Sequence, residues 1–511
     1  MKNNYLYLKK MILAGTLIFS LTVAAAQEPL LLQEHFEGTS GYDKSTGIKG
    51  YALNLSSTAA KRKPLKIELS STPVSGSLTT LIWVKAAAVD DQAYIFLSNK
   101  KEKKDSTETI WELGKQAGGA WYWAAAQGKG KYEYRPTVQR QAINDEKWHQ
   151  LAFTFNEQQK ELRLYYDGKN VGIYFTPELS SMLTKGSVLT VGGQSSGDLS
   201  EWETFNGMAD ELQVYNTTWS SEQVMKSYLS FTAGSSKKAE VIKVPAELKV
   251  MNYNIWHGGN ETGKYVGPAR IVDVIKASGA DLISMQETYG SGARIADALG
   301  YYFYLRSTNL SIMSRYPIEE TITGMQSFYN GGAHVNLGSG KRILFVTNWL
   351  NYPFDYWDDL EKNVAIDSAS WMNKQSETNA GTLKKILKAI NSDISKEIPV
   401  IFCGDFNTGS HLDWTVATKH LNKGHIMPFP TGMLMEEAGF KDSFRVIYPD
   451  PLKHRGITWS PQFKQAFKDR IDYIYYKGKG LVPVSSAVLD THKVWYPSDH
   501  GAVMTTFKLS Y

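Results

Sequence analysis

The hydrophobic pattern of the chain changes once, near residue 233, and this change limits the fold more than any other feature. Before it, apolar or alternating runs of strand length are separated by turn signals and include only one helical stretch, Glu222–Tyr228. The clearest runs are Thr79–Lys85, Leu151–Phe155 and Leu162–Tyr166, the last followed by the hairpin signal Asp167-Gly168. Short strands at this spacing predict an antiparallel β-sandwich.

From about residue 246, apolar strands alternate with amphipathic helices. The expected strands are Leu248–Ile255, Leu282–Gln286 and Ile398–Phe402, and the expected helices are Ala269–Ala277 and a segment around Leu383–Ile390. This alternation predicts an α/β domain. The small and basic run Ala233–Lys238 suits a linker. We therefore expect a β-sandwich over 28–232, a linker over 233–245 and an α/β domain over 246–511.

The first 26 residues have the features of a secretory signal peptide. Lys9 and Lys10 precede the apolar run Met11–Val23, and Ala24-Ala25-Ala26 provides a cleavage site. The run is shorter than the roughly 20 residues that span a bilayer, and no later segment is long and apolar enough. We expect no transmembrane segment and a secreted, periplasmic or extracellular location.

The chain contains one cysteine, Cys403, which excludes an intramolecular disulfide and a cysteine-based zinc cluster. The apolar residues Ile401 and Phe402 precede it in a predicted strand. We therefore expect a buried, inert thiol, and any metal must be bound by carboxylate, amide or imidazole groups.

The N-terminal half resembles a LamG-like, concanavalin A-type jelly-roll domain. The resemblance rests on Gly50–Leu55, Trp83-Val84-Lys85, Trp148-His149, Leu164–Gly168, Gly207–Tyr215 and Ser220–Val224. It implies an all-β sandwich that either binds a glycan or serves as a spacer. It also offers Asp210 and Glu211 as ligands of a Ca²⁺ ion, although a structural turn is the favoured interpretation of these two residues.

In the C-terminal half, five short segments each place a polar or acidic group at the end of a predicted strand. They are Met251–Trp256, Met285–Thr288, Cys403–Asn407, Asp469–Ile474 and Pro497–Gly501. Each segment alone suits a cap or a turn, but five in one domain indicate a site. Carboxylate and amide oxygens suit a hard cation such as Mg²⁺, with Mn²⁺ as an alternative. Strand ends that face a cleft are also where open sheets bind ligands.

These segments, in this order, resemble the endonuclease/exonuclease/phosphatase family. The likeness extends to Ser410–Thr415, Gly439–Arg445 and Gly456–Pro461. It implies a four-layer α/β sandwich of the deoxyribonuclease I-like class and a phosphoester hydrolase activity.

The resemblance also implies a role for each site residue. Asn254, Glu287 and Asp499 match positions that hold the divalent metal, Asp499 alternatively facing the phosphate. Asp405 and Asn407 match the pair that deprotonates and orients the attacking water. His500 matches the imidazole that contacts the scissile phosphate, and Asp472 the carboxylate that keeps this imidazole charged and oriented.

One position departs from the family pattern. The family usually has a histidine that contacts phosphate at the end of the strand before the central insertion, and here Trp349 takes that place. An indole has one N–H donor and does not titrate near neutral pH. Asn348, Asn351, His334 and His257 are candidates for supplying the missing donor; otherwise activity is reduced.

Charge bears on the substrate. Residues 251–511 contain 27 Lys and Arg against 25 Asp and Glu, a net charge of +2, whereas a duplex-binding nuclease concentrates basic residues along its phosphate track. The aromatic and acidic segment Tyr352–Asp359 is also unsuited to a polyanion. We expect a sugar-, lipid- or small-molecule-linked phosphate as substrate. The alternatives are a secreted nuclease and a glycan-binding surface protein with an impaired phosphoesterase domain.

Overall fold

The computed structural model describes residues 30–37, 39, 42–56, 64–69, 76–88, 91–99, 109–193, 205–232, 242–352, 356–394 and 397–510. The expected signal peptide and most of the expected linker lie outside these residues. No helix in the described part of the chain has the length and apolar character needed to cross a membrane.

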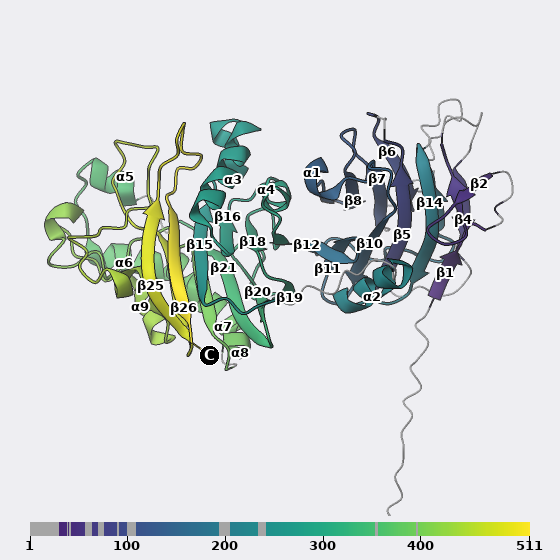
Figure 1. Cartoon of the computed structure of the whole chain (residues 1–511). Coiled ribbons are helices and arrows are strands. Elements are labelled where there is room, and N and C mark those ends of the chain that lie inside the picture. The colour runs from purple at the N-terminus through teal and green to yellow at the C-terminus, as the bar shows by residue number, and fades with distance from the viewer. Residues whose placement is uncertain are drawn as a thin grey trace, which may run out of the picture.

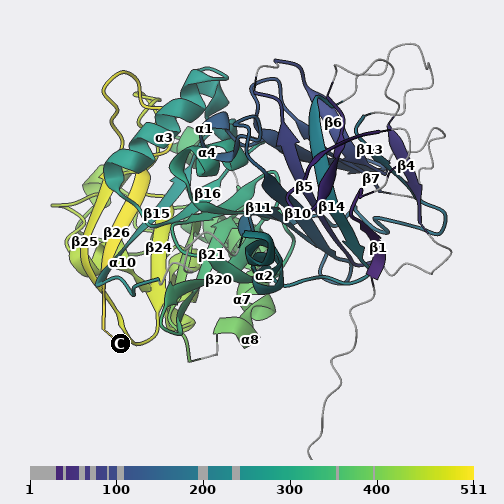
Figure 2. The same ribbon diagram turned by 45° about the vertical axis from the view of Figure 1, so that its right-hand side comes forward.

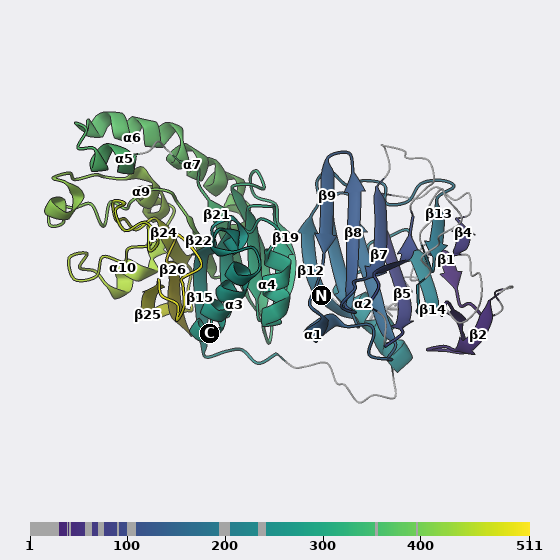
Figure 3. The same cartoon turned by 90° about the horizontal axis from the view of Figure 1, so that it is seen from above.

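The N-terminal half is a sandwich of two antiparallel sheets (Figures 1 and 3). One sheet has the order β2-β3-β14-β5-β10-β11-β12, with β1 paired to β14. Its strands are β1 (Leu30–Glu34), β2 (Asp43–Thr46), β3 (Tyr51–Asn54), β5 (Leu78–Ala86), β10 (His149–Asn156), β11 (Glu161–Tyr166), β12 (Lys169–Phe175) and β14 (Gly207–Tyr215). The other sheet has the order β4-β13-β6-β7-β8-β9. Its strands are β4 (Leu65–Glu68), β6 (Tyr94–Ser98), β7 (Ile110–Lys115), β8 (Trp121–Gln127), β9 (Gly130–Tyr134) and β13 (Val188–Val191).

Large aromatic side chains fill the space between these two sheets. Phe153 of β10 lies with its ring centroid 4.8 Å from Trp111 and 6.1 Å from Trp123, and all three are fully buried. The hairpin after β11 forms as expected, because Asp167 and Gly168 adopt φ values of 49° and 73°, the left-handed conformation that a tight two-residue turn requires. Two helices complete this half, α1 (Val138–Gln141) and α2 (Ser221–Thr232).

The C-terminal half has four layers, with helices outside two face-to-face sheets (Figure 3). The first sheet has the order β17-β18-β16-β15-β26-β25 and the second β19-β20-β21-β22-β24-β23. The first is formed by β15 (Glu247–Asn254), β16 (Leu282–Gln286), β17 (Tyr302–Leu305), β18 (Leu310–Ser314), β25 (Leu481–Leu489) and β26 (Ala502–Leu509). The second is formed by β19 (Ile318–Ile322), β20 (Asn330–Gly338), β21 (Lys341–Trp349), β22 (Val400–Asp405), β23 (Lys441–Asp442) and β24 (Asp472–Lys477). The expected four-layer α/β sandwich is thus confirmed.

The helices cover the outer faces of the two sheets. Ile271 and Ile275 of α3 pack with Met251 and Ile283 of the first sheet, whereas Leu383 and Ile386 of α7 pack on the second. The helical segments are η1 (His257–Thr262), α3 (Val266–Ser278), α4 (Gly292–Leu299), α5 (Tyr356–Glu361), α6 (Ser368–Glu377), α7 (Asn379–Ala389), α8 (Asn391–Ile394), η2 (Lys419–Asn422), α9 (Pro430–Glu437) and α10 (Ser443–Ile447). Cys403 lies fully buried between the sheets, and burial raises the pKa of its thiol, as expected of an inert cysteine.

The two halves share one continuous sheet. β12 of the sandwich pairs in parallel with β17, which joins the two sheets into fourteen strands. Figures 1 and 2 show the two halves side by side, with β11 on the side of the sandwich that faces the C-terminal half. The guanidinium of Arg306, just after β17, lies 4.0 Å from the ring centroid of Phe175 at the end of β12. Asp297 of α4 accepts hydrogen bonds from the backbone N–H of Thr137 at 2.6 Å and from the Gln141 amide at 2.6 Å. Backbone pairing and a buried carboxylate therefore both hold the halves together.

We predict that Asp297→Ala weakens this interface. The substitution removes the acceptor of the half-buried Thr137 N–H and one of the two acceptors of the buried Gln141 amide, a cost of about 1–3 kcal/mol. Thermal unfolding of the full chain should begin at a lower temperature and separate into two transitions. Glu377→Ala on α6, an exposed position, is the control. An unfolding profile identical to that of the unsubstituted chain would show that the carboxylate contributes nothing to docking.

Candidate active site

The five polar segments meet at one edge of the two packed sheets. Asn254, Gln286 and Asp405 end β15, β16 and β22, as expected. Asp472 and His500, however, stand at or before the start of β24 and β26, not at a strand end. These two strands run antiparallel to β22 and β15, so their first residues lie beside the last residues of their partners.

Polar side chains join the two sheets at this edge. Ser284 of β16 donates to the Thr347 hydroxyl of β21 at 2.8 Å, and Asn252 of β15 donates to Asp472 Oδ1 of β24 at 3.3 Å. Gln286 donates to Asn252 Oδ1 at 2.9 Å. Asn252 and Gln286 were within the expected segments but had no assigned role, because a hydrogen bond between two sheets has no sequence signature.

His500 lies between two carboxylates. Its Nδ1 is 2.8 Å from Asp472 Oδ2, and its Nε2 is 3.9 Å from Asp405 Oδ2. All three residues are at most 3% exposed. Burial lowers the pKa of His500, but Asp472 and Asp405 outweigh it and raise this pKa well above its ordinary value. The two carboxylates therefore favour the protonated imidazole, and its Nε2 lies on the Asp405 side of the ring.

Asp405 and Asn407 are placed together by the turn after β22. The backbone N–H of Asn407 donates to Asp405 Oδ1 at 2.9 Å, and the Asn407 amide donates to the Leu350 carbonyl at 2.7 Å. Burial raises the pKa of Asp405, His500 opposes this rise and Asp472 adds to it, and the net shift is upward. Asp405 is thus a stronger base than an ordinary aspartate.

Asn254, Glu287 and Asp499 lie on the other side of Asp405. The Asn254 amide donates to Glu287 Oε1 at 3.1 Å and to Asp405 Oδ2 at 3.0 Å. Asp499 Oδ1 is buried and has no hydrogen-bond partner among the described residues. Burial, aided by the charge of Glu287, raises the pKa of Asp499 to about 6. An unpaired carboxylate oxygen near a second carboxylate and an amide suits a divalent cation, so these residues fit the expected metal.

A second group of possible ligand atoms is formed by Asp405, Asp472 and His500, which lie within 4.8 Å of one another. The His500 Nδ1 already pairs with Asp472 at 2.8 Å, so only its Nε2 would face an added ion. The orphaned Asp499 Oδ1 makes the Asn254–Glu287–Asp499 group the better fit for the expected metal.

Several residues around the site adopt left-handed backbone conformations that side chains rarely take. Trp256, His257, Glu287 and Asn407 have φ values of 52°, 49°, 56° and 49°. Such conformations cost about 1–3 kcal/mol each and cluster at functional sites, where the surrounding structure imposes them. The concentration of strain here independently marks this edge as the site.

The structure distinguishes among the candidates for the missing histidine. Asn348 is buried and bonded to Asn330 and to the Cys403 carbonyl. Asn351 contacts Thr382, and His334 lies roughly 13 Å along β20 from the site edge. His257 does reach the site, with its backbone N–H 2.9 Å and its Nε2 3.7 Å from Glu287 Oε2.

Trp349 itself lies opposite Asp405 in the β21–β22 pair. Its ring stacks on Tyr329 with centroids 6.2 Å apart, and its indole nitrogen is covered and has no partner in the described part of the chain. The position that usually provides an imidazole therefore provides an aromatic surface.

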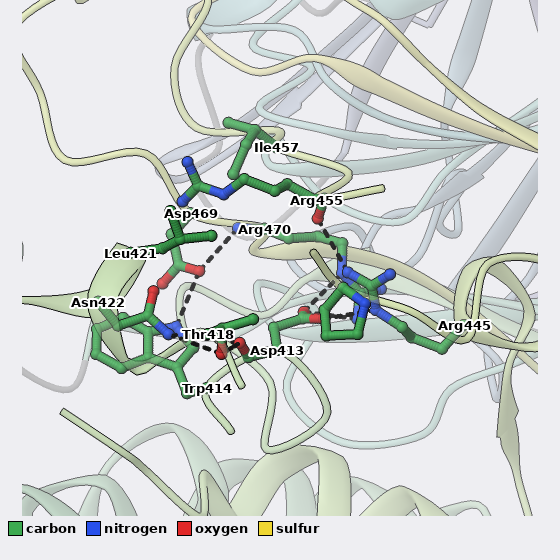
Figure 4. Close-up of a pocket in the computed structure, with 11 residues that line it drawn as sticks. Asp413, Trp414, Thr418, Leu421, Asn422, Arg445, Arg455, Ile457, Asp469 and Arg470 are labelled. Carbon is green, nitrogen blue, oxygen red and sulfur yellow. Dashed lines mark hydrogen bonds and ion pairs between the residues drawn. The ribbon is translucent and has the colours of Figure 1, made fainter. Parts of the chain in front are cut away.

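The family-like stretches around Asp413 and Asp442 are structural. Buried Arg470 binds Asp413 at 2.7 Å, and Arg445 also binds Asp413 (Figure 4). Arg470 also binds Asp442 at 2.7 Å. Asp469 accepts from the Trp414 indole at 3.2 Å, beside a cavity of about 20 Å³. This network holds the segment that leads into Asp472, so these motifs position the site without entering it.

In the N-terminal half, Asp210 accepts from the backbone N–H of Ile48 at 2.9 Å and of Glu211 at 2.8 Å. Glu211 pairs with His35 at 2.8 Å. Both carboxylates are thus engaged in local structure, which agrees with the structural-turn interpretation. The expected Ca²⁺ site there stays a prediction.

Comparison with known proteins agrees with this geometry. Residues 251–500 match the model of the endonuclease/exonuclease/phosphatase family, and residues 63–225 match that of the concanavalin A-like lectin/glucanases superfamily. The chain therefore combines a concanavalin A-like domain with an endonuclease/exonuclease/phosphatase domain of deoxyribonuclease I-like fold. An uncharacterized protein of Caenorhabditis elegans is 28% identical over 292 residues, which is 51% of this chain and 91% of that protein.

Solved structures resemble about half of the chain. An AP endonuclease from Archaeoglobus fulgidus is 16% identical with a TM-score of 0.37, and 51% of this chain and 100% of that chain are covered. The 3′ phosphatase NExo from Neisseria, bound to a product DNA hairpin, is 18% identical with a TM-score of 0.35, and the coverage is 52% and 100%. An endonuclease/exonuclease/phosphatase from Bacteroides vulgatus is 13% identical with a TM-score of 0.34, with the same coverage.

We predict that His500→Ala and Asp472→Asn have separable effects on phosphoester hydrolysis. Loss of the imidazole should lower kcat about 10²–10³-fold, the scale of a lost transition-state donor. Asp472→Asn should lower kcat less. It also removes one carboxylate that raises the His500 pKa, so His500 should lose its proton at a lower pH. The basic limb of the kcat profile should move to lower pH. A basic limb that stays in place would show that His500 is not the titrating acid.

Proposed function

We propose that the protein is a secreted, divalent-metal-dependent phosphoester hydrolase that acts on a sugar-, lipid- or small-molecule-linked phosphate. The observation that carries this proposal is the buried arrangement of Asp405, His500 and Asp472 beside the unpaired carboxylate of Asp499. The expected signal peptide supports secretion.

Asp405 and Asn407 would hold and deprotonate the attacking water. A water held between the Asp405 carboxylate and the Asn407 side chain would lose its proton to Asp405, whose raised pKa strengthens it as a base. When bound by Asn254, Glu287 and Asp499, Mg²⁺ or Mn²⁺ would neutralise charge on the phosphate oxygens. No serine or cysteine in the five segments is paired with a base, so direct attack by water suits this site better than a covalent intermediate.

His500 would act as the cationic hydrogen-bond donor to the phosphate. Its Nδ1–H is held by Asp472, which orients the ring, and its Nε2–H points to the space beside Asp405, where a phosphate oxygen would sit. A cationic donor aimed at that space stabilises the charge that develops in the transition state. Asp472 thereby acts through His500 and not on the substrate.

The charge of the C-terminal half favours a substrate whose phosphate is linked to a small or uncharged organic group over a polynucleotide. The C-terminal half carries a net charge of only +2, and Asp358 and Asp359 occupy the first turn of α5 near the aromatic residues of the site. The N-terminal concanavalin A-like domain agrees with a glycan-linked substrate, since its family model includes lectins.

Purified full-length protein should hydrolyse sugar phosphate, phospholipid or generic phosphoester substrates in the presence of Mg²⁺, and EDTA should abolish the activity. Asp405→Ala should remove turnover. Glu287→Gln should raise the Mg²⁺ concentration needed, because it removes a ligand charge while keeping the shape. Plasmid DNA as the best substrate would favour the nuclease alternative. Saturable glycan binding without turnover on any substrate would favour the impaired, glycan-binding alternative.

The stereochemical course tests direct attack by water. A substrate made chiral at phosphorus with sulfur and oxygen isotopes should react with inversion, because a single in-line displacement inverts the centre. Retention would require two displacements and a covalent enzyme intermediate, and the roles of Asp405 and Asn407 would have to be reassigned.

A further inference from the structure

A continuous chain of aromatic rings curves past the catalytic residues. Consecutive ring centroids are 5.5 to 6.4 Å apart, and the rings come from four separate loops, the end of β21 and helix α5. In spatial order they are Phe328, Trp349, Tyr352, Trp357, Trp459, Phe463 and Trp256, here called the aromatic collar.

The aromatic collar touches the site at three points. The Trp459 ring centroid is 5.1 Å from that of His500, and the Trp256 backbone N–H donates to Asn254 Oδ1 at 3.1 Å. Trp349 lies opposite Asp405 in the β21–β22 pair. The collar therefore passes the proton-transfer residues and ends beside the residues assigned to the metal.

Part of the collar is open to solvent. Phe328, Tyr352 and Phe463 are 38%, 55% and 43% exposed. Tyr289, two residues after Glu287, is also exposed, at 41%. Exposed apolar surface gathered at one place marks a binding surface.

We propose that the aromatic collar is a subsite that seats the sugar ring of a sugar-linked phosphate; this inference rests on the proposed function. The planes of consecutive rings meet at angles between 38° and 90°, so the collar presents ring faces in several directions and not the parallel slot that would hold a flat base. The C–H face of a sugar packs well on such ring faces, because aromatic faces carry partial negative charge.

The polar surroundings also suit a sugar. Asp359, half-buried on α5 two residues after Trp357, has a carboxylate that accepts hydrogen bonds from sugar hydroxyls and repels a phosphate backbone, whereas Asp358 pairs with Lys362. An acyl chain would gain nothing from this acceptor. Trp349 then has a clear role, since it exchanges a phosphate-contacting imidazole for a ring that recognises the group attached to the phosphate.

Binding to the full chain carrying Asp405→Asn, which keeps the shape of the carboxylate, tests the subsite without turnover. The probes are glucose 1-phosphate, galactose 1-phosphate and mannose 1-phosphate, with glycerol phosphate as the ligand that lacks a ring, all with Mg²⁺ in a calorimeter. Phe463→Ala or Phe328→Ala, added to this background, should weaken binding of at least one hexose phosphate about 10-fold and leave glycerol phosphate unchanged. Phe463→Tyr should retain binding, because it keeps the ring.

Tyr265→Ala, an exposed aromatic residue outside the collar, is the matched control and should change neither ligand. Equal effects of Phe463→Ala on hexose and glycerol phosphates, or no effect on either, would overturn the subsite. So would tighter, Phe463-dependent binding of AMP or dodecyl phosphate, which would identify a base or an acyl chain as the occupant. If the unsubstituted chain hydrolyses no ester yet shows the ring-dependent binding, the proposed hydrolase function fails while the subsite stands.

Discussion

The site depends on an imidazole buried between two carboxylates. His500 is 3% exposed, Asp405 and Asp472 beside it are each 1% exposed, and these two carboxylates raise the His500 pKa well above its ordinary value. Removing one partner of such a group leaves an uncompensated charge and costs several kcal/mol, so the three must be placed together or not at all. Because Asp405 and Asp472 belong to the second sheet and His500 precedes a strand of the first, the charges constrain how the two sheets face each other.

Other contacts in the C-terminal domain keep the two sheets in the arrangement that these charges require. Hydrogen bonds from Ser284 to Thr347 and from Asn252 to Asp472 hold the sheets in register at the site edge. Arg470 forms ion pairs with Asp413 and Asp442, and these fix the position of the segment that enters β24. Residues outside the site edge therefore determine where the Asp405 and Asp472 carboxylates lie, as precise positioning of a site requires.

The N-terminal domain is connected to the same framework. Arg306 packs on Phe175 of the sandwich and donates to the carbonyl of Asn330 at 3.0 Å and of Met325 at 3.0 Å. The segment between these two carbonyls carries Phe328, one end of the aromatic collar. The concanavalin A-like domain thus supports the wall of the active site as well as extending the sheet, which gives a physical reason for the two domains to share one chain.

The sequence alone determined the two fold classes, because strand-length runs and strand–helix alternation are local patterns. The strand-end segments and the family resemblance pointed to Asn254, Glu287, Asp405, Asp472, Asp499 and His500, which the structure brings to one edge of the sheets, while their roles stay a prediction. The sequence did not reveal the β12–β17 pairing, the structural role of Asp413, or the collar, in which Trp256 and Phe463 meet across 206 intervening residues. Those depend on which strands become neighbours, and strand pairing is set by packing over the whole chain, which no local pattern records.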